Sequence, residues 1–151
     1  MKILITLFFL IKINYPSNDL EQIRYINKIV DASLKQYCFL GIEYDITFED
    51  SKADVTITPC VQFYDPIYLG TTDGTIHLNK DIYGIPDIKL AKINNDELLT
   101  KVLVHEVGHF LGYTEHSLDP QSIYYPTLDY YKSQYITRYD SIKLYHLLNF
   151  R

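Results

Sequence analysis

Hydrophobic residues in the first part of the chain recur with two different periods, which predict its first four elements. The nearly unbroken apolar run ILITLFFLI at residues 3–11 is typical of a buried β-strand. Over residues 19–38, apolar side chains recur at steps of three and four, as they do along one face of an amphipathic helix. Apolar and polar residues then alternate at 42–48 and again at 53–58, which is the period of a strand. The pattern therefore predicts the order strand, helix, strand, strand.

The middle of the chain is less regular. Residues 59–74 begin with a proline that should end the preceding strand, and they are rich in Asp, Pro, Gly and Thr, so we expect a loop. The segment GTIHLN at 74–79 alternates once more and predicts a fourth short strand. Residues 80–93 show no clear period and are predicted to be loop.

Two more helices are predicted in the second half. Asn94 and Glu97 have the three-residue spacing of a helix cap, and a helix over residues 95–111 follows. Residues 112–138 look mostly irregular, and a last helix covers about 139–149. Strands and helices in this order predict an α+β fold.

The composition is that of a globular protein without a nucleic-acid-binding surface. The chain has 151 residues, enough for one core, so we expect a single domain over residues 1–151. The formal net charge is −5, and the basic residues form no run or stripe, which argues against nucleic acid as a partner. We expect a monomer that does not act at a membrane.

The N-terminal run has a second interpretation. Met1 and Lys2 followed by apolar residues to Ile11 also resemble the start of a signal peptide, although the run is too short to span a membrane. No small-residue cleavage site follows, which favours the strand and an intracellular protein. Cys38 and Cys60 leave the compartment open: they form a disulfide only if their Cα atoms approach within about 7 Å, and two separate core thiols are the simpler expectation.

Three of the five histidines lie within twelve residues, beside a glutamate. His105 and His109 are four apart on a predicted helix, so both imidazoles face the same way and can bind one metal ion. Glu106 completes an H-E-x-x-H pattern, in which the glutamate accepts a proton from a metal-bound water. Gly112 can end the helix, and His116 then supplies a third imidazole. Three protein ligands and one open position are the arrangement of a catalytic zinc site.

These residues make the chain resemble the metzincin metallopeptidases, and most closely the matrixins. The metzincin motif is HExxHxxGxxH, and matrixins typically continue with HSxDPxSIMYP; residues 105–126 read HEVGHFLGYTEHSLDPQSIYYP. ADVTIT at 53–58 and LGTTDGTIHLN at 69–79 are also similar to strands of that family, and the predicted helix at 139–149 matches its C-terminal helix. The resemblance implies a twisted mixed sheet of about four to five strands, two long helices, one of them carrying HExxH, and a C-terminal helix.

The resemblance also implies a function. His105, His109 and His116 would bind one catalytic zinc ion, Glu106 would be the general base, and the chain would be a zinc endopeptidase. A peptide or protein substrate would lie along the edge strand near 74–79.

The first departure from the family pattern is one extra residue before the third histidine. The family position falls on Glu115, and His116 comes one residue later. The spacing from His116 to the turn at 122–126 is that of the matrixins, so we favour His116. Glu115 remains an alternative, because a carboxylate oxygen also binds zinc.

The second departure is the loss of the methionine that underlies the metal in the family. The chain has only Met1, and Tyr124 stands at that position of the turn. A larger, polar-tipped side chain there needs a hydrogen-bond partner. The alternative function is therefore a catalytically weak or inactive zinc-binding domain that acts as a protein-binding module, although an intact Glu106 argues against it.

Other features of the family are weaker here. Asp65 and Asp73 lie in a loop that can carry structural calcium in matrixins, but the carboxylates are too few for us to predict a calcium site. His77 and His146 are expected to be structural. Neither cysteine lies in a latency motif and the domain pattern starts near Met1, so we expect a protein that needs no processing.

Overall fold

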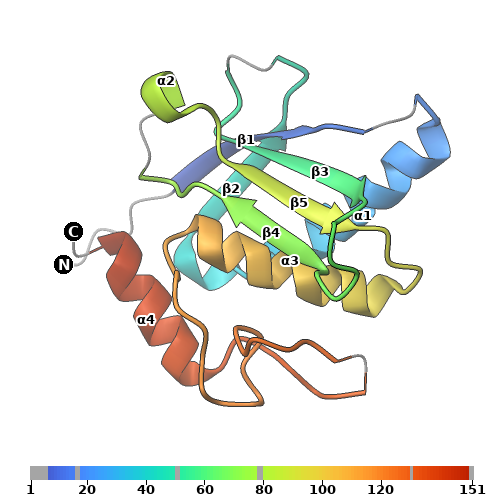
Figure 1. Cartoon of the computed structure of the whole chain (residues 1–151). Coiled ribbons are helices and arrows are strands. Elements are labelled where there is room, and N and C mark those ends of the chain that lie inside the picture. The colour runs from blue at the N-terminus through green and yellow to red at the C-terminus, as the bar shows by residue number, and fades with distance from the viewer. Residues whose placement is uncertain (1–6, 16–17, 50–51, 78–79, 130, 150–151) are drawn as a thin grey trace.

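The structure is a computed structural model that describes residues 7–15, 18–49, 52–77, 80–129 and 131–149. A mixed sheet is covered on one face by two long helices, and a third helix lies near the C-terminus (Figure 1). The elements are β1 (Leu7–Ile13), α1 (Leu20–Lys35), the 3₁₀ turn η1 (Cys38–Leu40), β2 (Ile42–Ile46), β3 (Val55–Val61), β4 (Gly70–Asp73), α2 (Lys80–Tyr83), β5 (Asp87–Ala91), α3 (Asp96–Phe110) and α4 (Arg138–Asn149).

The five strands are arranged in the order β2-β1-β3-β5-β4. Every neighbouring pair is parallel except the last, in which β4 runs antiparallel to β5 with Gly70 opposite Leu90 and Asp73 opposite Asp87. Parallel neighbours need long crossovers, and α1 provides the one between β1 and β2. Because β4 ends the strand order, its outer side has no strand partner in the part of the chain that the structure describes.

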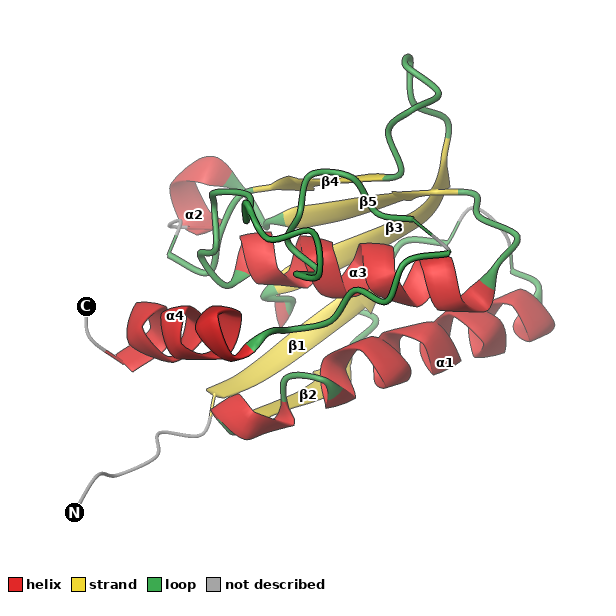
Figure 2. Ribbon diagram, turned by 90° about the horizontal axis from the view of Figure 1, so that it is seen from below, coloured by secondary structure: helices red, strands yellow, loops and turns green. Residues whose placement is uncertain are grey.

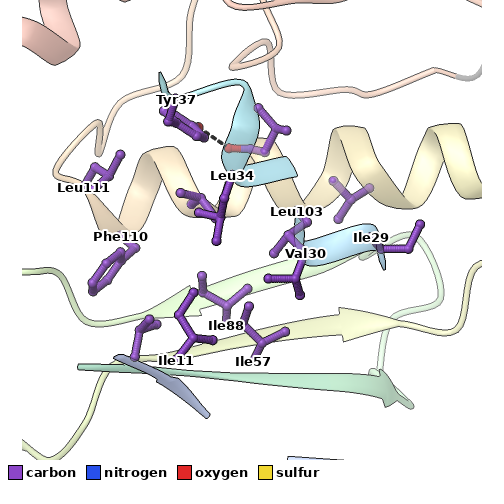
Figure 3. Close-up of a cluster of buried hydrophobic side chains, with 14 of the residues drawn as sticks. Ile11, Ile29, Val30, Leu34, Tyr37, Ile57, Ile88, Leu103, Phe110 and Leu111 are labelled. Atoms are coloured by element: carbon purple, nitrogen blue, oxygen red, sulfur yellow. Dashed lines mark hydrogen bonds between the residues drawn. The ribbon is translucent and has the colours of Figure 1, made fainter. Parts of the chain in front are cut away.

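The core lies between the sheet and the helices α1 and α3, which pack side by side on the same face (Figure 2). Figure 3 shows side chains of three parallel strands facing those of the two helices. Each of these core residues is nearly inaccessible to solvent, and their burial is the main stabilising contribution to the fold. They include Ile11, Ile57 and Ile88 from the strands, Val30 and Leu34 from α1, and Leu103 from α3.

The predicted α+β fold is confirmed, and so is the strand interpretation for the described part of the N-terminal run. Residues 7–13 form β1 in the interior of the sheet, between β2 and β3. The remainder of the run, residues 1–6, lies outside the described residues. Within the described ranges, no helix combines the length and the apolar composition that a membrane span requires.

Two predictions about the strands were wrong. The fourth strand is β4 at 70–73, not residues 74–79, of which 78–79 are outside the described residues. Ile76 instead donates its backbone N–H to the Phe110 carbonyl at the end of α3, at 2.8 Å. Residues 87–91, predicted to be loop, form β5. The alternation of β5 spans only five residues after Pro86, so β3 and β4 on its two sides define it more than its own sequence does.

Several element ends also differ from the predictions. β3 continues past Pro59 to Val61, through a register shift at which Cys60 has a φ of 58°. β2 ends at Ile46, two residues early, and Phe48 is exposed. The predicted first helix ends at Lys35, where the chain tightens into η1.

The two cysteines do not form a disulfide. Cys38 and Cys60 are both free thiols. Both are exposed, so the expectation of core thiols was wrong.

Candidate metal centre

Helix α3 carries the H-E-x-x-H pattern and is buried on nearly all sides. Its N-cap is Asn95, one residue after the predicted cap, and the Asn95 side chain accepts from the Leu98 N–H at 2.9 Å. The helix ends at Phe110, and Gly112 follows with a φ of 109°, a left-handed conformation that favours glycine. The sheet and α1 cover one side of α3, and the segment leading to α4 passes along the other (Figures 1 and 2).

Three imidazoles converge at the C-terminal half of this helix. The Nε2 atoms of His105 and His109 are 3.0 Å apart. His116, from the loop after Gly112, completes a group whose candidate ligand atoms all lie within 4.8 Å of one another. The His116 ring centroid is 5.2 Å from that of His105 and 5.1 Å from that of His109.

Hydrogen bonds orient the two helix imidazoles. The Nδ1 of His105 is 2.7 Å from the Ile123 carbonyl oxygen, and the Nδ1 of His109 is 2.7 Å from the Tyr113 carbonyl oxygen. Because a carbonyl oxygen only accepts, each Nδ1 carries the proton and each Nε2 presents a lone pair. Burial lowers the pKa of His105 to about 4 and also lowers the pKa of His109. Both rings are therefore neutral near pH 7, which is the form that binds a metal.

Glu115, the alternative third ligand, lies away from the cluster. Its carboxylate oxygen is 3.6 Å from the Lys143 Nζ on α4, and its side chain is 83% exposed. The extra residue is thus accommodated in an outward loop at Thr114 and Glu115, which are both exposed, and the structure brings His116 rather than Glu115 to the two helix histidines.

Glu106 is buried beside the histidines, and a residue of the sheet holds its carboxylate in place. The Thr72 hydroxyl on β4 donates to the Glu106 carboxylate oxygen Oε2 at 2.5 Å and also lies 3.0 Å from the Glu106 carbonyl oxygen. Burial raises the pKa of Glu106 to about 7, and the Thr72 hydrogen bond opposes that rise. β4 can lie this close because residue 70 is a glycine. A Cβ at this position would be only 2.9 Å from Val102 Cγ1 and 3.1 Å from Glu106 Cγ.

A cleft of about 650 Å³ opens over the three histidines and Glu106. The edge strand β4 with the residues on either side of it lines the cleft, and so do residues 126–128 from the segment that leads to α4. The cleft therefore follows β4, whose outer side pairs with no other strand among the described residues.

Asp140 connects the loops that frame the cluster. Its buried carboxylate accepts from the Tyr113 hydroxyl at 2.8 Å, from the Ser122 hydroxyl at 2.6 Å and from the Thr137 N–H at 3.0 Å. Thr137 in turn accepts from the Asp140 N–H at 3.2 Å, which is the reciprocal arrangement of a capping box. The hydrophobic pattern predicted the helix at about 139–149, and the Thr-x-x-Asp spacing marks its cap, but nothing local in the sequence marks the two distant hydroxyls.

Asp140→Asn should destabilise the protein by about 1–3 kcal/mol, because the amide nitrogen replaces an acceptor that faces only donors. The free energy of unfolding in urea measures this cost. Asp119→Asn is the matched control: Asp119 is exposed and accepts from the Gln121 N–H at 2.9 Å, a turn contact that asparagine makes equally well. Equal stabilities of the two variants would contradict the role of Asp140.

Four residues considered in the sequence do not join the cluster. His77 and His146 line a separate cavity beside α4. Asp65 accepts from the Ile67 N–H in its own turn, and Asp73 pairs with Lys89 at 3.2 Å.

The donor set fits a zinc ion. Two nitrogens bound to one tetrahedral zinc, each at about 2.0–2.1 Å, lie roughly 3.3 Å apart, close to the 3.0 Å between the Nε2 atoms of His105 and His109. A third imidazole is within reach, and the cleft leaves the fourth position to water or substrate.

Comparisons with known proteins agree with this geometry. A family model described as Matrixin matches residues 42–146, which include β4, α3, all three histidines and most of α4. A search of curated proteins finds no match. The matched segment covers more than half of the chain, and the chain therefore belongs to the matrixin family, whose domains are of the zinc metallopeptidase type.

Proposed function

We propose that this chain is a zinc-dependent endopeptidase in which His105, His109 and His116 bind the metal and Glu106 is the general base. The observation that carries the proposal is the convergence of three imidazoles next to a buried carboxylate at the floor of one cleft. A binding module needs no carboxylate beside its metal ligands, whereas hydrolysis needs a base there.

The residues of the site have distinct roles in this proposal. Zinc, when bound, supplies the acidity that makes a water nucleophilic near neutral pH and polarises the scissile carbonyl. Thr72 occupies Oε2 of Glu106, which leaves Oε1 to accept the proton of the attacking water. Glu106 then donates that proton to the leaving amine. The carbonyl oxygens of Ile123 and Tyr113 keep the two helix imidazoles oriented, and burial keeps them neutral.

The substrate would be a peptide or an extended protein segment. It would add to the sheet along the outer side of β4, at Gly70–Asp73, rather than at 74–79. Main-chain hydrogen bonds to an edge strand are independent of the substrate sequence, so specificity would come from the cleft walls.

Purified chain with one zinc per molecule is expected to cleave members of a mixed peptide library and an unfolded protein, with new termini identified by mass spectrometry. A chelator should abolish cleavage, and added zinc should restore it. Zinc bound at one per chain without cleavage of any substrate would instead favour the binding module. Tyr124 at the position of the family methionine is the feature that keeps that second function open.

A further inference from the structure

A pair of buried tyrosine hydroxyls lies beneath the histidine cluster. Tyr124 is fully buried, and its ring centroid is 6.1 Å from that of His105 and 4.2 Å from that of Tyr113. Its hydroxyl oxygen is 2.6 Å from that of Tyr37, which directly precedes η1 and is also fully buried. Burial raises the pKa of both phenols, so both stay protonated.

The direction of this hydrogen-bond chain follows from its end. The Tyr37 hydroxyl donates to the Val104 carbonyl oxygen in α3. Since a phenol has one proton to donate, the Tyr124 hydroxyl must be the donor to Tyr37. The turn at Tyr124 is thereby connected through Tyr37 to the residue that precedes His105.

Gly108 provides the space that Tyr124 occupies. A Cβ at Gly108 would be 2.1 Å from Tyr124 Cε1 and 2.8 Å from Cζ, closer than any real contact. Glycine in a helix interior weakens the helix relative to alanine, so the ring of Tyr124 gives a physical reason for glycine at this buried position.

The two ends of this hydrogen-bond chain both lead to neighbours of His105. Val104, which accepts from Tyr37, precedes His105 in α3, and Ile123, whose carbonyl accepts from the His105 Nδ1, precedes Tyr124. A displacement of Tyr124 therefore moves the acceptor that sets the His105 ring and its tautomer.

We propose that Tyr37, Tyr124 and Gly108 form one positioning unit that takes the place of an apolar floor and fixes the His105 imidazole for metal binding. The inference rests on the proposed metal site, but its readouts are melting temperature and zinc affinity, so it stands or fails independently of peptide cleavage. None of the three residues contacts substrate in this proposal, and all act through His105.

The first experiment tests the hydroxyl pair. Tyr124→Phe and Tyr37→Phe should each raise the zinc dissociation constant by about 10-fold or more, the effect expected for partners that orient a metal ligand. The loss of zinc affinity in the double variant should be smaller than the sum of the losses in the two single variants, because the double variant leaves no hydroxyl unpaired.

Tyr44→Phe is the matched control for this experiment. The Tyr44 hydroxyl on β2 donates to Asp31, at the opposite edge of the sheet from β4. Its loss should lower the melting temperature without changing zinc affinity. Lower melting temperatures with unchanged zinc affinity for Tyr124→Phe and Tyr37→Phe as well would overturn the positioning role.

The second experiment tests the fit between Gly108 and Tyr124. Gly108→Ala alone should lower the melting temperature by several degrees, roughly 5–10 °C, or prevent folding, because the methyl group overlaps the Tyr124 ring. In a Tyr124→Met background the flexible side chain can move aside, so the same Gly108→Ala change should be neutral or raise the melting temperature. The proposal would be overturned if Gly108→Ala lowered the melting temperature equally with Tyr124 and with Tyr124→Met, or if the double variant failed to fold. Either result would show that the two positions do not pack against each other.

Discussion

Glu106→Gln is expected to lower the rate of peptide cleavage by about 10²–10⁴-fold while zinc affinity and folding stay unchanged. The amide has the shape of the carboxylate, and its oxygen can still accept from the Thr72 hydroxyl. It cannot accept a proton from water and return it to the leaving amine, so the loss falls on the chemical step. Rates on one library peptide, with zinc titrated separately for each variant, measure the two effects independently.

Glu115→Gln is the matched control for that experiment. It makes the same chemical change nine residues later, on a side chain that is exposed and paired with Lys143 rather than directed at the cleft. Its cleavage rate should equal that of the unmodified chain. If Glu106→Gln cleaved as fast as the unmodified chain, another group would be the base. The separate zinc titration shows that any slower cleavage by Glu106→Gln does not come from loss of the metal.

The histidine motif could be recognised from the sequence because its information is local. His105, Glu106 and His109 occupy one helix, and the helical repeat alone places the two imidazoles on one side. The position of Gly112 likewise predicted the helix end, which its left-handed backbone explains. The long strands and helices were predicted for the same reason, since their periods extend over enough residues to be read.

The parts that were missed depend on contacts between distant segments. β5 is short and becomes a strand because β3 and β4 pair with its two sides. The fourth strand was predicted at 74–79, directly after the residues that form β4. Thr72 contacts Glu106 across 34 positions, and the Tyr37 hydroxyl meets that of Tyr124 across 87. No periodicity in one sequence encodes such pairs. Tyr124 was noticed as a departure with a hydroxyl to satisfy, but its partner could be identified only in three dimensions.

The choice of His116 over Glu115 gives the second large effect. His116→Ala should weaken zinc binding by more than the roughly 10–100-fold that the loss of an outer partner of a ligand causes, because it removes a ligand itself and leaves two imidazoles on one helix. The extra residue in the loop does not prevent this role. Tyr113 is anchored to Asp140 by its hydroxyl and to His109 by its carbonyl, so the loop diverges only after Tyr113 and returns at His116.

Glu115→Ala provides the comparison that decides between the two ligands. It removes a largely exposed ion pair with Lys143, which contributes little to stability, and zinc affinity should change by no more than a few-fold. Competition with a chromophoric chelator at fixed pH measures both variants on one scale. A larger loss for Glu115→Ala than for His116→Ala would mean that the loop rearranges on metal binding so that a carboxylate replaces the third imidazole. That outcome would change the site to two histidines and one carboxylate, with a lower net charge at the bound metal and a less acidic water for Glu106 to deprotonate.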